Sequence, residues 1–169
     1  IRVGEIFHLT GAYAAGQAGL VEAAADGFEA ANRYMNLPEN VEIEHIWIPT
    51  GDGIRLAAKL WLPEDAENNP VPAVLEYLPY RLRDGTRQRD AMHMRYFAGH
   101  GYAAVRVDIR GSGNSEGILG DEYLESELSD GEHILSWIAE QPWCNGAVGM
   151  IGISWGGFNA LQVAALNPP

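Results

Sequence analysis

The sequence predicts an α/β fold: a mostly parallel sheet with an antiparallel N-terminal hairpin and helices on both faces, preceded by an extra β–α unit. From about residue 41 onward, strand-like stretches alternate with helix-like stretches, and this alternation favours parallel strands connected by helices. Near residue 52, a glycine-containing turn instead joins two strand-like stretches directly, which is typical of an antiparallel hairpin.

The bulk properties are those of an ordinary soluble globular protein. The chain of 169 residues is long enough for one domain with a proper core. Its net charge of −12 argues against a nucleic-acid partner and against binding to an anionic membrane surface. No apolar run approaches membrane-spanning length. The single cysteine, Cys144, excludes an internal disulfide and leaves the compartment open.

Residues 1–36 differ from the rest of the chain. A strand-like start is followed by a Leu-Thr-Gly-Ala-Tyr turn and an alanine-rich helical stretch. This segment resembles the opening β–α unit of the periplasmic amino-acid- or urea-binding proteins of ABC transporters. The resemblance implies ligand contacts from Thr10, Gly11 and Tyr13, and a plain β–α unit at the end of the sheet is an equal alternative. One β–α unit cannot form a two-lobed cleft, so we expect no binding function from it alone.

Residues 37–40 break that helix and mark the predicted start of a second domain, residues 37–169. Residues 42–48 alternate polar and apolar, as a half-exposed strand does. The glycines of residues 51–53 suit a turn, and residues 54–62 return as the partner strand. These stretches form the predicted hairpin.

A strand, a helix and a second strand follow the hairpin. Residues 73–78 and 102–108 are mostly apolar and predict buried strands. Between them, Asp90 can cap a helix that continues through His100. The arginine-rich residues 81–89 predict a loop that crosses the mouth of an active site, or simply solvated charge.

A glycine-containing loop at residues 110–117 follows the second of these strands. A dinucleotide-binding reading fails because Glu116 stands where the third glycine is required. Asp108 and Arg110 are predicted to organise the loop, paired with each other or with the main chain.

Seven carboxylates and no Lys or Arg occur between residues 116 and 132. We expect most of them on the solvated face of a helix, with a cation-binding cluster as the alternative. The apolar face of that helix is predicted to consist of Leu128, Ile134, Leu135, Trp137 and Ile138.

The pattern Gly-Ile-Ser-Trp-Gly at residues 152–156 lies between an apolar run, residues 147–151, and a helix-forming run, residues 158–166. A strand, a sharp glycine turn around a serine and a helix are the context of a nucleophilic hydrolase. Ser154 is therefore predicted to be a nucleophile. The alternative is a glycine-rich turn with an incidental serine.

Motifs spread along the second domain carry a family resemblance; they lie at residues 52–56, 78–81, 108–117, 137–138, 141–144 and 149–157. Together they resemble the N-terminal part of the Xaa-Pro dipeptidyl-peptidase and cocaine-esterase family of α/β-hydrolases. The resemblance implies acyl transfer to water from a small-molecule ester or a short peptide. No cofactor is implied, and neither a His-Glu-x-x-His motif nor a cysteine cluster suggests a metal.

The resemblance also implies an oxyanion hole made by the backbone N–H of Trp155 and the hydroxyl of Tyr80. The residues alone favour a surface-turn tyrosine at position 80. Relatives that hydrolyse α-amino-acid esters place an acidic residue two positions after the serine, where this chain has Gly156.

The catalytic triad of α/β-hydrolases runs in the order Ser, acid, His, and residues 155–169 contain no Asp, Glu or His. All five histidines precede Ser154. We therefore expect a truncated α/β-hydrolase with little activity alone. The alternatives are a fragment of an amino-acid-binding module and a non-catalytic domain with the same fold; the oligomeric state stays open.

Overall fold

The computed structural model describes residues 41–83 and 85–168. Outside the described residues lie the predicted leader, the predicted domain boundary and three residues implied as ligand contacts: Thr10, Gly11 and Tyr13. No helix in the described part is both long enough and apolar enough to cross a membrane.

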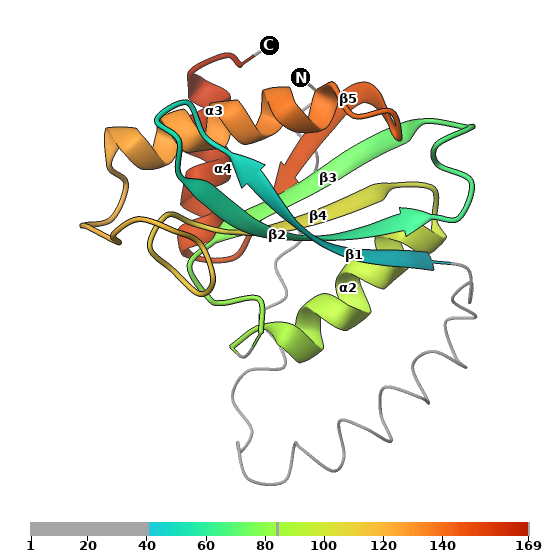
Figure 1. Cartoon of the computed structure of the whole chain (residues 1–169), viewed down its shortest axis with the longest axis horizontal. Helices are drawn as coiled ribbons and strands as arrows, with labels where there is room; N and C mark the ends of the chain where they lie inside the picture. The colour runs from blue at the N-terminus through green and yellow to red at the C-terminus, as the bar shows by residue number, and fades with distance from the viewer. Residues whose placement is uncertain (1–40, 84, 169) are drawn as a thin grey trace, which may run out of the picture. The chain divides into compact units, whose positions relative to one another are not determined.

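Five strands in the described part form one mixed sheet (Figure 1). They are β1 Val41–Pro49, β2 Arg55–Pro63, β3 Val71–Leu78, β4 Ala103–Asp108 and β5 Cys144–Ile151. Their order across the sheet is β1-β2-β4-β3-β5. β1 and β2 form the predicted antiparallel hairpin, β2 is antiparallel to β4, and β4, β3 and β5 run parallel. For the described residues, the predicted mixed sheet is confirmed.

Three helices flank this sheet in the described residues: α2 Arg87–Gly99, α3 Glu125–Ala139 and α4 Trp155–Ala165. Figure 1 shows α3 and α4 on one face of the sheet and α2 on the other. This is the predicted arrangement, with a helix in each connection between the parallel strands.

Strand β4 is buried along its whole length and contributes to two hydrophobic cores, one on each face of the sheet. The core beneath α3 and α4 takes Ala103, Val105 and Val107 from this strand. The core beneath α2 consists of Trp61, Met94, Ala98 and Ala104. Because successive side chains of a strand alternate between its faces, Arg106 lies on the α2 side.

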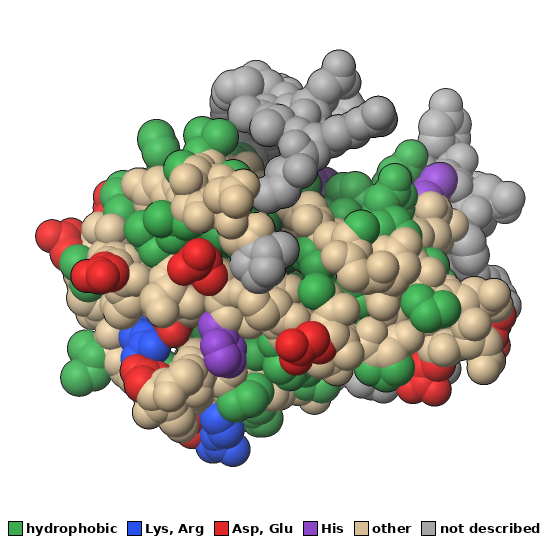
Figure 2. Space-filling view, turned by 90° about the horizontal axis from the view of Figure 1, so that it is seen from above, with side chains coloured by type: hydrophobic (Ala, Val, Ile, Leu, Met, Phe, Trp, Pro, Cys, Tyr) green, Lys and Arg blue, Asp and Glu red, His purple; other side chains and the backbone are tan. Residues whose placement is uncertain are grey.

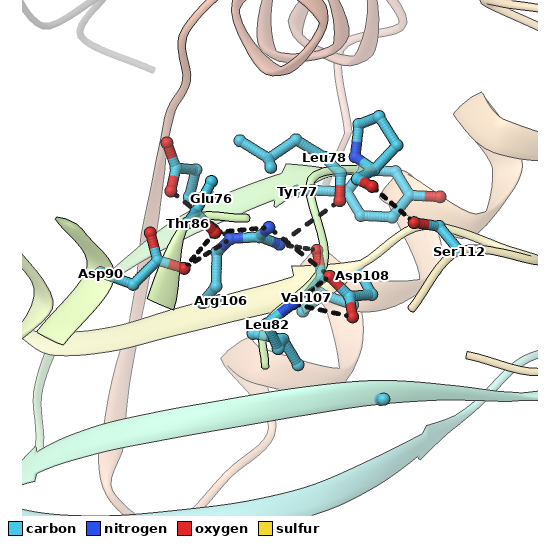
Figure 3. A network of polar contacts seen from close by, with 12 residues as sticks. Glu76, Tyr77, Leu78, Leu82, Thr86, Asp90, Arg106, Val107, Asp108 and Ser112 are labelled. Carbon is cyan, nitrogen blue, oxygen red and sulfur yellow. Dashed lines mark hydrogen bonds and ion pairs between the residues drawn. The ribbon is translucent and has the colours of Figure 1, made fainter. Parts of the chain in front are cut away.

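Arg106 is fully buried and surrounded by carboxylates (Figure 3). Its guanidinium nitrogens lie 3.3 Å from Asp90 Oδ2, 3.6 Å from Glu76 Oε2 and 3.5 Å from Asp108 Oδ1. Arg89 adds a second cation and donates hydrogen bonds to Glu76 and Asp90. Two cations thus face three carboxylates between the sheet and α2, and loss of one partner would leave a buried charge uncompensated.

This network corrects two expectations, one for Arg89 of the arginine-rich segment and one for Asp90. Arg89 does not carry simple solvated charge, because its side chain is only 17% exposed and is bonded to buried carboxylates. Asp90 does not cap the helix, because α2 already begins at Arg87 with Thr86 in the cap position. Asp90 instead accepts a 2.7 Å hydrogen bond from the Thr86 hydroxyl.

Two carboxylates expected on the solvated face of α3 are buried. Glu127 is 5% exposed and Asp130 is 3% exposed. Asp130 accepts hydrogen bonds of 2.8 and 2.7 Å from the Arg110 guanidinium, and Asp52 of the hairpin turn accepts a third of 2.6 Å. The hydrogen bond from Arg110 holds the pKa of the Asp52 carboxyl well below its usual range. Arg110 therefore organises its loop through these two carboxylates.

The outer face of α4 exposes apolar side chains. Phe158 and Leu161 are each 55% exposed, and Leu166, directly after the helix, is 47% exposed. The neighbouring strand β5 is also mostly exposed or half-buried. Figure 2 shows hydrophobic side chains reaching the surface between acidic ones when the molecule is seen from above. These exposed apolar side chains lie beside β5, which is an edge strand of the described sheet.

From the burial of Glu76 we expect the free energy of unfolding to depend on pH. Burial raises the pKa of its carboxyl from 4.5 to about 7, against the opposing charges of Arg89 and Arg106. The folded chain therefore binds this proton more tightly than the unfolded chain. The resulting stabilisation is complete below pH 4.5 and is lost as the pH rises through about 7.

Over this interval we expect the free energy of unfolding to fall by up to about 3 kcal/mol relative to the Glu76→Gln variant. Urea unfolding at several pH values, followed by tryptophan fluorescence, measures the difference. The same pH dependence in both proteins would contradict the prediction.

Candidate active site

A sharp turn between β5 and α4 carries Ser154. The strand ends at Ile151 and the helix begins at Trp155, so only three residues connect them. Ser154 adopts φ 53° and ψ −117°, a backbone conformation that costs strain in any residue with a Cβ. The residue is exposed and stands at the N-terminus of α4, where the helix dipole favours negative charge. This is the strand, elbow and helix arrangement that the motif predicts.

Lack of space explains the two glycines of the motif. A Cβ on Gly152 would lie 2.2 Å from the carbonyl carbon of Gly156 and 2.6 Å from the amide nitrogen of Gly157. A Cβ on Gly156 would lie 2.9 Å from Leu78 Cδ2, at the end of β3. The elbow therefore packs against the backbone of the first turn of α4, and that turn packs against the Leu78 side chain of β3.

The hydroxyl of Tyr80, from the turn after β3, reaches this elbow. The backbone N–H of Trp155 points at Tyr80 Oη, and the nitrogen and oxygen atoms are 3.4 Å apart. Two donors that each bind one oxyanion at about 2.7–3.1 Å lie about 3 to 5 Å from one another, so this separation suits a shared oxyanion. The structure thus brings the three predicted residues, Ser154, Trp155 and Tyr80, together.

The side chain of Trp155 is fixed by a residue that the sequence analysis did not assign to the site. Its indole N–H donates to Glu127 Oε1 at 2.5 Å, and the other carboxylate oxygen accepts the backbone N–H of Tyr123 at 3.1 Å. Tyr123 adopts φ 61°, and its ring lies 5.7 Å from the Trp155 ring and 5.6 Å from the Phe158 ring. Glu127 therefore joins α3 to the first turn of α4.

The phenol of Tyr123 stays neutral beside the carboxylates of Glu122 and Glu127. Desolvation raises its pKa, and the charges of Glu122 and Glu127 raise it further. Aromatic rings and a neutral phenol thus lie beside the elbow.

Within the described residues, no histidine or carboxylate is hydrogen-bonded to Ser154. His100 pairs with the backbone oxygen of Tyr96 at 2.7 Å, and His93 lies on α2, on the opposite face of the sheet. His133 is exposed on α3. The described part also has no group of three His, Cys, Asp or Glu side chains placed to bind a metal. The site thus contains an exposed serine hydroxyl, with the Trp155 N–H and the Tyr80 hydroxyl beside it.

Comparison with known proteins identifies relatives of the described domain. Residues 52–169 match the family model of the X-Pro dipeptidyl-peptidase (S15 family). A cocaine esterase from Rhodococcus is 38% identical over 124 residues, covering 71% of this chain and 20% of the esterase. A putative serine esterase from Mycobacterium bovis is 36% identical over 130 residues, covering 68% of this chain and 21% of the esterase. The chain therefore spans about a fifth of the length of these relatives.

A solved structure has the same fold. The CocE/NonD family hydrolase from Staphylococcus aureus superposes with a TM-score of 0.66 at 23% sequence identity. The match covers 76% of this chain and 26% of the hydrolase. The five strands and three helices thus have the arrangement found in an α/β-hydrolase of this group.

The elbow predicts that Gly152→Ala destabilises the chain far more than Gly149→Ala, three residues earlier in β5. A Cβ on Gly149 has the Ala73 oxygen as its nearest neighbour at 4.0 Å, so alanine fits there. For Gly152→Ala we expect a loss of about 3 kcal/mol, because the first turn of α4 must move away. Urea unfolding measures both variants, and equal unfolding midpoints would contradict the prediction.

Proposed function

The chain belongs to the X-Pro dipeptidyl-peptidase (S15) family, and from this membership and the site geometry we propose that it carries the nucleophile and oxyanion hole of a serine hydrolase. Such an enzyme transfers an acyl group from an ester, an amide or a peptide to water. The proposed substrates are small esters or short peptides, because the family is described by a peptidase activity and two relatives are esterases.

One observation carries the proposal: the Trp155 N–H and the Tyr80 hydroxyl meet beside Ser154 although the two residues are 75 positions apart. An amide N–H and a phenol hydroxyl are uncharged donors; here the N–H donates to the phenol oxygen, and an acyl oxygen that replaces this bond can accept from both. Oriented neutral donors around a nucleophile stabilise the oxyanion that forms when an acyl carbon is attacked. A glycine turn with an incidental serine does not require this convergence.

In the proposed reaction, Ser154 Oγ forms a bond to the acyl carbon and loses its proton to a base. The carbonyl oxygen becomes an oxyanion bound by Trp155 N–H and Tyr80 Oη–H. Collapse of this intermediate expels the leaving group, which takes up a proton, and leaves an acyl-enzyme. Water then attacks the ester and releases the acid and the free serine. The described residues supply the nucleophile and the two donors, and we assign the base to none of them.

Gly156 bears on the choice of substrate. As a glycine, residue 156 has no side chain that could bind an ammonium group. A Cβ there would lie 2.9 Å from Leu78 Cδ2, so a larger side chain does not fit without movement. The proposed substrates therefore do not depend on an ammonium contact at this position.

A fluorophosphonate probe tests the proposal in the chain itself. We expect an adduct at Ser154 at least tenfold faster than at Ser126 and Ser129, which are also exposed but lie on a regular helix. The elbow and the two donors retain part of the rate enhancement when a triad member is missing. Peptide mass mapping over time measures the labelling rate of all three serines in one sample. The Tyr80→Phe substitution should slow the labelling of Ser154 by about tenfold or more.

Equal labelling of the three serines in a chain with native circular dichroism would overturn the proposal and favour the non-catalytic alternative. A rate at Ser154 that Tyr80→Phe leaves unchanged would remove Tyr80 from the oxyanion hole. Calorimetric binding of free amino acids without preferential labelling would instead favour the amino-acid-binding alternative.

A further inference from the structure

The turn that carries Tyr80 is bonded to β4 and the loop after it (Figure 3). On one side of Tyr80, the Ser112 hydroxyl donates a 2.6 Å hydrogen bond to the carbonyl of Pro79. On the other side, both carboxylate oxygens of Asp108 accept the backbone N–H of Leu82, at 3.0 and 3.1 Å. The backbone on either side of Tyr80 is therefore fixed by these two side chains.

The start of the turn is bonded from the same direction. The carbonyl of Leu78 accepts the backbone N–H of Ile109 at 3.3 Å and Nη1 of Arg106 at 3.4 Å. Arg106 also lies 3.5 Å from Asp108, so the buried charge network extends to the turn. All of these hydrogen-bond partners of the turn come from β4 or from the residues directly after it.

These contacts form in a site with little access to water. Asp108 is fully buried and Ser112 is 6% exposed. Burial raises the pKa of Asp108, and the Leu82 N–H and the charge of Arg106 oppose that rise. Gly113, at φ 57°, closes the loop so tightly that a Cβ there would lie 2.0 Å from Asp108 Oδ2. Loss of the Asp108 bonds therefore leaves the N–H of the buried Leu82 without its partner, and loss of the Ser112 bond leaves the carbonyl of the half-buried Pro79 without one.

The turn needs such contacts because its conformation is costly. Arg81, directly after Tyr80, adopts φ 61°, a conformation that residues with a Cβ keep only when their surroundings determine it. The hydroxyl of Tyr80 must also stay near the Trp155 N–H, which belongs to a different element. A displacement of about 1 Å at a reacting group can cost about a hundredfold in rate.

We propose that Ser112 and Asp108 are positioning residues: by fixing the carbonyl of Pro79 and the N–H of Leu82, they place the Tyr80 hydroxyl beside the Trp155 N–H for oxyanion binding. In this proposal both side chains act through the main chain of the Tyr80 turn and not through contact with the substrate. The inference rests on the proposed function of Tyr80, and it assigns the glycine-containing loop after β4 a part in the reaction.

Ser112→Ala tests the inference, and Ser115→Ala is its matched control. Ser115 lies in the same loop, but its hydroxyl donates to the Asp108 main-chain carbonyl at 2.6 Å and accepts the N–H of Ala57 at 2.9 Å, and it bonds neither Pro79 nor Leu82 of the Tyr80 turn. We expect Ser112→Ala to slow fluorophosphonate labelling of Ser154 by about fivefold. We expect Ser115→Ala to leave it within about twofold.

A double-mutant cycle separates positioning from general loss of structure. If Ser112 acts through Tyr80, Ser112→Ala has no further effect on labelling in a Tyr80→Phe background. The same fivefold loss in both backgrounds, or an equal loss for Ser115→Ala, would overturn the inference. Asp108→Asn, which keeps one acceptor for Leu82, should show the same dependence on Tyr80.

A fluorine label on Tyr80 reads the position of the turn without any reaction. With 3-fluorotyrosine at the seven tyrosines, Tyr80→Phe assigns the Tyr80 resonance. Ser112→Ala should shift that resonance and Ser115→Ala should not. A shift in a protein whose Ser154 is not preferentially labelled would refute the proposed function but retain the positioning role. An unmoved resonance would refute the positioning role alone.

Discussion

The close approach of Gly152 to the first turn of α4 is the constraint on which the site depends. Gly152 has no side chain, and the backbone of Gly156 and Gly157 occupies the space that a Cβ would need. This close approach lets the chain turn within three residues. That sharp turn forces Ser154 into a strained conformation, at a cost of about 1–3 kcal/mol. The strain is tolerated because both neighbours of the elbow are fixed on β3: β5 by strand pairing, and α4 by the contact between Gly156 and Leu78.

A second constraint acts on the opposite face of the sheet. Arg106 would be strongly unfavourable in an apolar layer alone, and its carboxylate partners come from β3, β4 and α2. Such a cluster adds little net stability compared with apolar packing, but it penalises any arrangement that separates a partner. The network therefore locates α2 and the ends of β3 and β4 relative to one another. The turn with Tyr80 begins at one of these ends.

The features predicted from the sequence are those that local patterns determine. The hairpin and the elbow depend on residues close in the chain, and both were predicted. The burial of Glu127 could have been predicted, because with Asp130, Ile134 and Ile138 it follows the helical spacing of the buried face. Because carboxylates are mostly exposed in proteins, its residue type predicted a solvent-exposed position instead. The partners of Arg106 could not have been predicted from pattern, since they lie on three separate elements. Tyr80 was implied only by the family resemblance, because its contact with Trp155 spans 75 residues.

The order of the strands explains how groups so far apart in sequence meet. Parallel strands end at the same edge of a sheet, and residues that follow neighbouring strands are neighbours in space. In the order β4-β3-β5, strand β3 lies between the other two. The turn after β3 can therefore present Tyr80 to the elbow after β5 and be bonded from the other side by Asp108 and Ser112 at the end of β4. If the turn lay at the end of an edge strand, only one side would have a neighbour, and the tyrosine would have either its partner or its support. The central place of β3 gives it both.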